Sequence, residues 1–259
     1  MKLLGIEGRL RTDTNSPTRP RFLQIADNIR AQITSGGLAE HDILPSERAL
    51  SDRYGVSRVT GRRALQALET EGLVYNADRR GRFVSPKRLR YNVSNMVSFL
   101  ASAQANDLDL EIKVIQAAEH IAKNEILTTL ELSEYSRVIE YTRLFHSGGH
   151  PIFIETEYLV ADRFPNFLEK DLRQSTSQTL EKSYGTSANT GNIIIRMRGV
   201  KANEAKLLNI ALSHAIIELE QVIYDDAGTP FCFGRQVWRG EMAEFSALAI
   251  VSQNGQSRA

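Results

Sequence analysis

The chain has 259 residues, 42% of them hydrophobic, which is enough for one large domain or two ordinary domains with packed cores. Its net charge of +1 hides an asymmetry: residues 1–90 hold 17 Lys and Arg against 10 Asp and Glu, whereas the remainder holds 15 against 21, which favours two domains with a polyanion partner at the front. No apolar run reaches the ~20 residues of a membrane helix, residues 1–4 do not begin a secretory leader, and Cys232 is the one cysteine, so we expect a cytoplasmic protein without internal disulfides.

The first predicted element is a helix that follows a flexible tail over residues 1–19. Gly36 and Gly37 predict where this helix ends. Its apolar residues recur at helical spacing: Phe22, Ile25, Ala26, Ile29 and Ile33.

Two short helices joined by a tight turn are predicted next, between residues 46 and 68. Ser46 and Ser57 can cap their first turns, and Gly55 supplies the left-handed residue that ends the first of them. The second helix has a small or apolar face made of Gly61, Ala64, Leu65 and Leu68.

The opposite face of that second helix carries Arg58, Arg62 and Arg63, with Thr60 near the edge. A basic helix with an apolar back and a preceding helix is typical of a helix-turn-helix, and its arginines suit phosphates and guanine edges. The alternative is an ordinary helix with a solvated basic face.

A short hairpin follows, with strands at residues 73–75 and 83–84. Its turn carries Arg79, Arg80 and Arg82 together with Gly81. A basic turn by itself is usually only solvated, but after a helix-turn-helix it indicates a wing whose tip, with Arg80 and Gly81, can enter the minor groove.

These residues resemble the winged-helix domain of the GntR family of bacterial transcription regulators. The matching segments are residues 20–26, 44–48, 54–58, 62–65, 71–73 and 80–84. The resemblance implies DNA contacts from Arg48, Ser57, Arg58, Thr60, Arg62 and Gly81. The family usually has Val or Leu where Gly61 stands, and since glycine inside a helix costs about 1 kcal/mol relative to alanine, we expect Gly61→Ala to raise the melting temperature.

Residues 86–107 are predicted to connect two domains. The basic stretch 86–90 is expected to lack regular structure, and residues 93–105 are compatible with a helix. Beyond them, six strands are predicted at residues 111–118, 137–145, 152–160, 192–200, 216–224 and 231–238, with helices near 123–130, 175–183 and 203–209. Glycine turns at 148–149 and 225–228 predict hairpins, hence an antiparallel sheet with helices to one side, an α+β domain.

This second half resembles the effector-binding domain of the HutC subfamily of GntR regulators, which has the chorismate-lyase fold. The resemblance rests on residues 97–99, Arg143, Pro151, Glu155, 184–185, 228–230 and 239–241. It implies a metabolite pocket with Ser98, Arg143, Glu155 and Ser175 as ligand positions. Phe145 and Cys232 stand where the family often has an arginine and a glutamate, so no known ligand, phosphorylated amino sugars included, can be transferred directly.

Other chemistry has little support in the sequence. The five histidines lack metal-site spacing, although His146 and His150 flank a turn and could form a metal pair. No phosphate-loop or hydrolase motif occurs. Cys232 fits a buried apolar side chain better than a redox sensor. Arg143 needs a partner if buried, either Glu155 or Glu157 or an anionic effector.

The sequence therefore predicts a cytoplasmic, homodimeric transcription regulator that acts as a repressor. Its expected parts are a tail (1–19), a winged helix-turn-helix (20–85), a linker (86–107) and an effector-binding and dimerisation domain (108–252). The expected partners are operator DNA and a small polar or anionic metabolite, with no metal and no cofactor. An enzyme with a chorismate-lyase-like domain and an architectural DNA binder without effector remain the alternatives.

Overall fold

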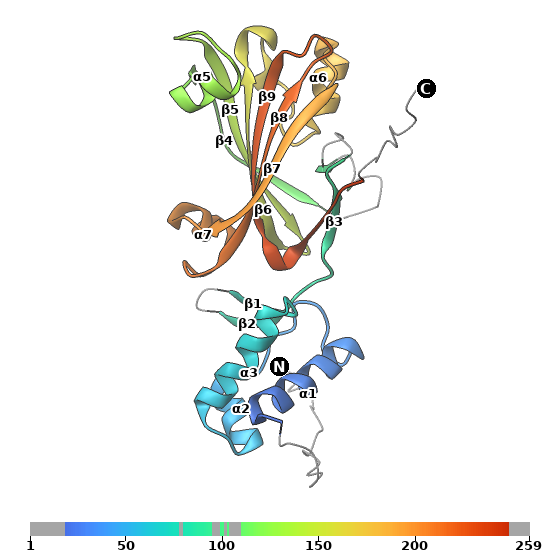
Figure 1. The fold of residues 1–259 in the computed structure, drawn as a ribbon, viewed down its shortest axis with the longest axis vertical. Coiled ribbons are helices and arrows are strands. Elements are labelled where there is room, and N and C mark those ends of the chain that lie inside the picture. Colours follow the sequence, from blue (N-terminus) through green and yellow to red (C-terminus); the bar gives the residue numbers. More distant parts are fainter. Residues whose placement is uncertain (1–18, 78–79, 95–98, 101–102, 104–109, 249–259) are drawn as a thin grey trace, which may run out of the picture. The chain divides into compact units, whose positions relative to one another are not determined.

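The computed structural model describes residues 19–77, 80–94, 99–100, 103 and 110–248. These residues form two compact units (Figure 1). The first extends to Lys87 and includes the short segment Asn209–Ala211, and the second comprises the rest. Of the predicted tail, residues 1–18 lie outside the described residues. No helix within the described ranges is long and apolar enough to cross a membrane.

The N-terminal unit consists of three helices and a hairpin. The helices are α1 (Arg21–Thr34), α2 (Glu47–Tyr54) and α3 (Arg58–Thr70), and the hairpin strands are β1 (Val74–Ala77) and β2 (Gly81–Val84). Both predicted caps are confirmed, because Ser46 Oγ accepts from the backbone N–H of Ala49 and Ser57 Oγ accepts from that of Thr60, each at 3.2 Å. Gly55 ends α2 with a φ of 62°, as its position predicted.

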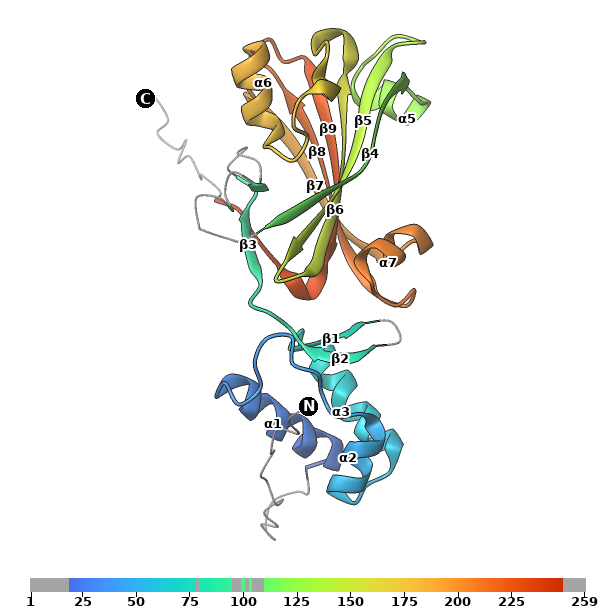
Figure 2. The same cartoon turned by 180° about the vertical axis from the view of Figure 1, so that it is seen from behind.

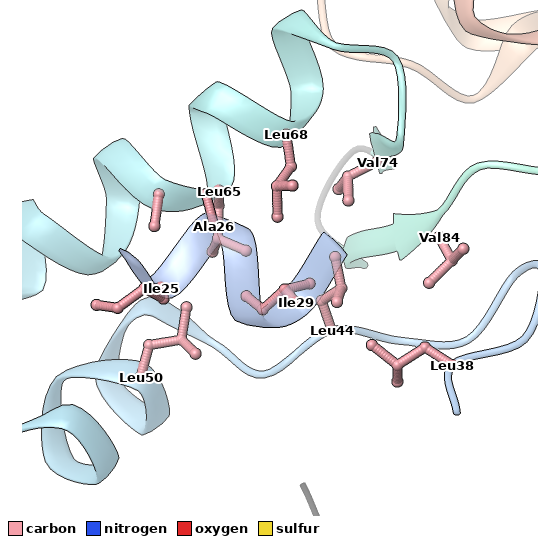
Figure 3. Packing of buried hydrophobic residues seen from close by; sticks show 11 residues of the cluster. Ile25, Ala26, Ile29, Leu38, Leu44, Leu50, Leu65, Leu68, Val74 and Val84 are labelled. Carbon is pink, nitrogen blue, oxygen red and sulfur yellow. The ribbon is translucent and has the colours of Figure 1, made fainter. Parts of the chain in front are cut away.

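One apolar core joins these elements (Figure 3). It contains Ile25, Ala26, Ile29, Leu38, Leu44, Leu50, Ala64, Leu65, Leu68, Val74 and Val84. The segment before α2 also runs beside β2, with Leu44 N–H donating to Arg82 O at 2.8 Å and Val84 N–H donating to Asp42 O at 2.9 Å. The sequence did not predict this third, strand-like edge of the wing, because the segment pairs with a hairpin that lies far along the chain.

The C-terminal unit is built on a six-stranded sheet (Figures 1 and 2). All neighbouring strands are antiparallel, in the order β4-β5-β6-β9-β8-β7. The six predicted strands are confirmed as β4 (Glu111–Ile121), β5 (Arg137–Ser147), β6 (His150–Val160), β7 (Thr190–Gly199), β8 (Ala215–Tyr224) and β9 (Pro230–Arg239). Short helices η1 (Ala161–Arg163), η2 (Phe167–Glu169), α7 (Ala202–Leu208) and η3 (Gly240–Met242) connect them.

Helices cover both faces of this sheet, so the expectation of helices on one side is wrong. Leu180 of α6 (Thr176–Tyr184) belongs to the same core as Ile139 of β5. Ile126 of α5 (Asn124–Thr129) packs instead with Val138. Because consecutive strand residues point to opposite faces, α5 and α6 lie on opposite faces of the sheet. The central strands are buried on both faces, and both therefore need a cover.

The expectation that residues 86–90 lack regular structure is confirmed for residues 86–88 and wrong for Leu89 and Arg90. Strand β3 (Leu89–Asn92) pairs in parallel with β10 (Ala243–Ser246). Its partner lies more than 150 residues further along the chain, so no local sequence pattern could predict this pairing. Tyr91 of β3 brings an aromatic ring to 6.3 Å from that of Trp238, and Phe99 packs at 5.1 Å from the same indole. This aromatic cluster lies on the α6 face, next to the site described below.

Candidate functional site

Helix α3 presents a cationic surface to solvent. Gly61 and the apolar residues of its back are buried, whereas Arg58 and Arg62, which flank this buried face, are exposed. Arg62 Nε lies 3.4 Å from Glu47 Oε2, a long contact between a half-exposed pair that leaves most of the guanidinium accessible. Arg48 on α2 is also exposed and pairs weakly with Asp52 at 3.9 Å.

Two predicted DNA contacts have a local structural role as well. Ser57 caps α3, and its hydroxyl lies 3.0 Å from that of Thr60. These side chains hold the first turn of α3 and still lie at its exposed end, where helix N–H groups favour phosphate oxygens. Arg63, which the sequence placed on the same basic face, turns back onto α1, with its guanidinium 4.2 Å from the centre of the Phe22 ring.

Ion pairs that the sequence did not predict connect the wing to α2 and α3. Arg82 of β2 donates to Glu69 Oε1 of α3 at 2.6 Å and lies 3.4 Å from Glu47 Oε1 of α2. Gly81 has a φ of 105°, a conformation that side chains rarely adopt. Arg80 next to it is exposed, with its guanidinium 5.8 Å from the Phe83 ring centre.

Exposed apolar residues accompany the basic ones. Val59 on α3 is 59% exposed, because it lies on the side of the helix that faces away from the buried Gly61. A methyl-bearing side chain among major-groove arginines suits the methyl group of thymine. Val59 was not predicted as a contact, although the helical period already places it away from the apolar face of α3.

The second site lies on the α6 face of the sheet, around Arg143. This residue is 2% exposed, and its guanidinium donates to Glu155 Oε2 from Nε at 3.1 Å and from Nη2 at 2.5 Å. Nη2 also donates to Glu157 Oε2 at 2.7 Å. Both carboxylates named as alternatives are thus its partners. A buried arginine with two carboxylates leaves an excess of negative charge when both are ionised.

Glu157 and the start of α6 complete the cluster. Glu157 Oε2 accepts from the hydroxyls of Tyr141 and Thr176, each at 2.5 Å. Burial, reinforced by the charge of Glu155, raises the pKa of Glu157 despite the opposing effect of Arg143. Neither Tyr141 nor Thr176 was predicted for the site, since each becomes relevant only through the register of β5 and the position of α6.

A hollow opens beside this cluster. Its lining is mixed, with two carboxylates, several small polar groups and an apolar wall. The lining residues are Glu155, Glu157, Thr176, Ser177, Leu180, Thr186, Ala188, Gln221, Ile223, Phe231 and Cys232. A hollow that combines an apolar wall with a few polar groups has the lining typical of small-molecule sites.

The four predicted ligand positions are only partly brought together. Arg143 and Glu155 form an ion pair, and Glu155 also lines the hollow. Ser175 is buried as the cap of α6, accepting from Gln178 N–H at 3.4 Å, one residue before Thr176. Ser98 lies outside the described residues.

The connection from this site to the aromatic cluster is a short relay. Gln236 Nε2 donates to Glu155 Oε1 at 2.8 Å, and Gln236 Oε1 accepts from the Trp238 indole at 2.9 Å. Because the indole only donates, it fixes the amide orientation. Gln236 was not predicted, and its role follows from its register opposite Glu155.

The remaining chemical candidates have weaker surroundings. Burial raises the pKa of the Cys232 thiol, and the nearby Glu157 charge adds to this, which disfavours a reactive thiolate. Burial lowers the pKa of His146. Within the described ranges, no group of three or more His, Cys, Asp or Glu could hold a metal ion.

Two protein families match this sequence. Residues 22–84 match the family described as bacterial regulatory proteins, gntR family. Residues 105–244, more than half of the chain, match the UTRA domain. The first match covers the winged helix and the second covers the six-stranded sheet.

Individual relatives extend over most of the chain. The HTH-type transcriptional repressor NagR of Bacillus subtilis (strain 168) is 24% identical over 226 residues, covering 87% of this chain and 93% of that protein. The mannosyl-D-glycerate transport/metabolism system repressor MngR of Escherichia coli (strain K12) is 27% identical over 233 residues, covering 89% and 96%. The crystal structure of PhnF from Mycobacterium smegmatis matches with a TM-score of 0.62 at 22% identity, over 88% of this chain and 100% of that one, which supports the fold.

Proposed function

This chain belongs to the gntR family of bacterial regulatory proteins, in the branch that carries a UTRA domain, and we propose that it is a transcriptional repressor controlled by a small effector. The winged-helix unit binds operator DNA, and the sheet unit binds the effector. NagR and MngR are themselves named repressors.

One observation carries the DNA-binding half of this proposal. The exposed arginines of α3 and the strained glycine of the wing belong to one compact unit, in which ion pairs from Arg82 reach both Glu69 and Glu47. A helix of this kind reads the major groove with Arg58 and Arg62, while Arg80 and Gly81 approach the minor groove. Arg48, Ser57 and Thr60 contact the phosphates.

Regulation is a population shift. An effector that binds one conformation of the sheet unit more tightly than another changes the affinity of the reading heads for DNA. One recognition helix covers few base pairs, so we propose a homodimer on a two-fold symmetric operator. The protein acts in the cytoplasm, without a cofactor and without catalysing a reaction. An architectural DNA binder would instead keep its DNA affinity unchanged by any metabolite.

The test is operator binding by alanine variants of the recognition helix. A DNA site is first selected by the protein from random duplexes. Arg58→Ala and Arg62→Ala are expected to lose about 1–3 kcal/mol of binding free energy on that site and to change base preference. Arg137→Ala, an exposed arginine paired with Glu119 in the sheet unit, serves as the matched control and should bind like the parent. Unchanged affinity in both α3 variants would exclude this interface.

Salt dependence gives a second readout of the same contacts. Phosphate contacts release counterions, so binding should weaken steeply as salt rises, and loss of one phosphate contact should lower the slope by about one. A flat salt response would contradict the assignment of Arg48 to phosphate.

A further inference from the structure

The charged groups around the hollow are unbalanced in favour of negative charge. The charged side chains in its lining are Glu155 and Glu157, and the one cation in contact with them within the described residues is Arg143. A pocket built for an anion would present spare donors to its ligand. The donors and acceptors of this cluster can be accounted for atom by atom.

Arg143 has no spare donor for a ligand. A guanidinium has five N–H groups. Nη1 donates to the backbone carbonyls of Leu172 and Gln174 at 3.0 and 2.7 Å. Nε and Nη2 donate to Glu155 and Glu157, and Nη2 also lies 3.1 Å from Thr176 Oγ1. The guanidinium is therefore saturated by the chain itself.

Glu157 occupies the place that a bound anion would need. Its Oε2 receives Arg143 Nη2 and the hydroxyls of Tyr141 and Thr176, the latter being the first residue of α6. A cation, two hydroxyls and a helix N-terminus together form an anion cradle. Here the anion is a carboxylate of the chain, so phosphate or carboxylate from solution would have to displace it.

What remains exposed to the hollow is an acceptor. Glu155 Oε2 is held by Arg143 and Oε1 by Gln236. Glu157 Oε1 has, within the described residues, only the Cys232 thiol, at 3.9 Å. A buried carboxylate oxygen without an N–H or oxygen-linked O–H donor is energetically costly until a donor arrives.

We propose that the effector pocket takes a small amine, whose ammonium donates to Glu157 Oε1 and whose apolar body packs on the opposite wall. Leu180, Ile223 and Phe231 supply that wall. The ammonium restores charge balance, since it adds one positive charge to one arginine and two carboxylates. The proposal rests on the proposed function, because it names the effector class of the same pocket. The sequence predicted a small polar or anionic metabolite, and the proposal replaces the anionic alternative with a cationic one.

The experiment uses the full chain and four probes that differ in charge. Benzylamine, benzyl alcohol and benzoate share one ring, and inorganic phosphate tests the anion cradle directly. Benzylamine at about ten times its Kd should raise the melting temperature by roughly 3–6 °C. Benzyl alcohol, benzoate and phosphate should each raise it by less than half as much. A larger rise with benzoate or phosphate, or no rise with benzylamine up to tens of millimolar, would overturn the proposal.

A charge-removing variant locates the response. Glu157→Gln keeps the size of the side chain and should weaken benzylamine binding at least about tenfold. Glu181→Gln, an exposed glutamate of α6, is the matched control and should respond like the parent. A parent-like response of Glu157→Gln would also overturn the proposal, and the comparison of the four probes stands on its own if this variant does not fold.

The same samples separate this inference from the proposed function. Each is tested for binding to the selected DNA site. DNA binding without any amine response refutes only the amine effector, whereas loss of DNA binding by the parent protein refutes the repressor itself.

Discussion

At the scale of single residues, the same side chain has opposite roles in the two units because its surroundings differ. Arg58 and Arg62 on α3 are exposed and keep their donors for a polyanion. Arg143 is 2% exposed and spends its donors on two carboxylates and two carbonyls. The sequence identified all three as candidate anion contacts, but it could not separate them, because saturation depends on strand register and on the position of α6.

The packing around Gly61 argues against the rise in melting temperature that helix propensity predicts for Gly61→Ala. A Cβ on Gly61 would lie 3.1 Å from the backbone oxygen of Glu47 and 3.4 Å from Leu50 Cβ. Helix propensity favours alanine by about 1 kcal/mol, whereas overpacking against a backbone atom costs about 1–3 kcal/mol. We expect a lower melting temperature for Gly61→Ala in a calorimetric scan. A rise would mean that α2 moves away at no cost.

Glu241 makes stability depend on acid pH. Burial raises its pKa, but the hydrogen bond with His214 and the charge of Arg239 outweigh burial and lower the pKa to about 2. The unfolded chain therefore binds the extra proton between pH ~4.5 and ~2, so this contribution is complete above that window and is lost as pH falls through it.

The matching variant is Glu241→Gln. We expect its free energy of unfolding to be lower at pH 7 by up to about 3 kcal/mol, with a smaller loss of stability than the parent between pH 4.5 and 2. Urea denaturation at a series of pH values measures both. Parallel stability curves for parent and variant would rule out this linkage.

At the scale of elements, the segments with local signals were predictable. These signals involve residues that lie close together in the sequence. They are the caps of α2 and α3, the glycine after α2 and the alternation of the six strands. The β3–β10 pair and the two-sided cover of the sheet were not predictable, because both depend on contacts between distant segments. In the candidate effector site, the pairing of Arg143 with Glu155 or Glu157 was predicted from the cost of burying an unpaired charge, and the resemblance supplied Arg143 and Glu155 as ligand positions. The roles of Thr176 and Gln236 depend on the fold.

The wing offers a test of how elements hold each other. Arg82→Ala removes the contacts to Glu69 and Glu47, and we expect a loss of about 1 kcal/mol in stability together with weaker DNA binding. Arg80→Ala, two residues away and exposed, should weaken DNA binding with no change in melting temperature. Melting curves and DNA titrations of both variants distinguish a residue that positions the wing, as expected for Arg82, from a residue that contacts DNA, as expected for Arg80. Equal losses of stability in the two variants would contradict the idea that the ion pairs of Arg82 hold the wing in place.

At the scale of the whole molecule, the division of charge matches the division of chemistry. The front of the chain carries the basic surface, and the acidic remainder holds a pocket whose own carboxylates outnumber its arginine. An amine effector is positively charged and a DNA phosphate is negatively charged, so neither unit binds the other unit's ligand. Coupling between them then requires the conformational change of a regulator rather than direct competition.

Strand β7 is the sheet edge best suited to pair two copies of the chain in the proposed homodimer. Among the described residues this strand pairs only with β8, over ten residues without a register shift, and it leaves Ile194, Ile195 and Met197 exposed, the last at 75%. A long regular edge with exposed apolar side chains is suited to pairing with a second copy. The opposite edge, β4, is interrupted by a register shift after Val114, which protects an edge from pairing.

We therefore expect the double variant Ile195→Lys and Met197→Lys to be monomeric in sedimentation experiments and to bind the selected operator at least about tenfold more weakly, because a single reading head recognises half a site. Val114→Lys with Ile115→Lys on β4, where both residues are exposed, is the matched control and should remain dimeric. If the β4 variant dissociates and the β7 variant does not, the dimer forms through the other edge. If neither does, the two copies meet away from both sheet edges.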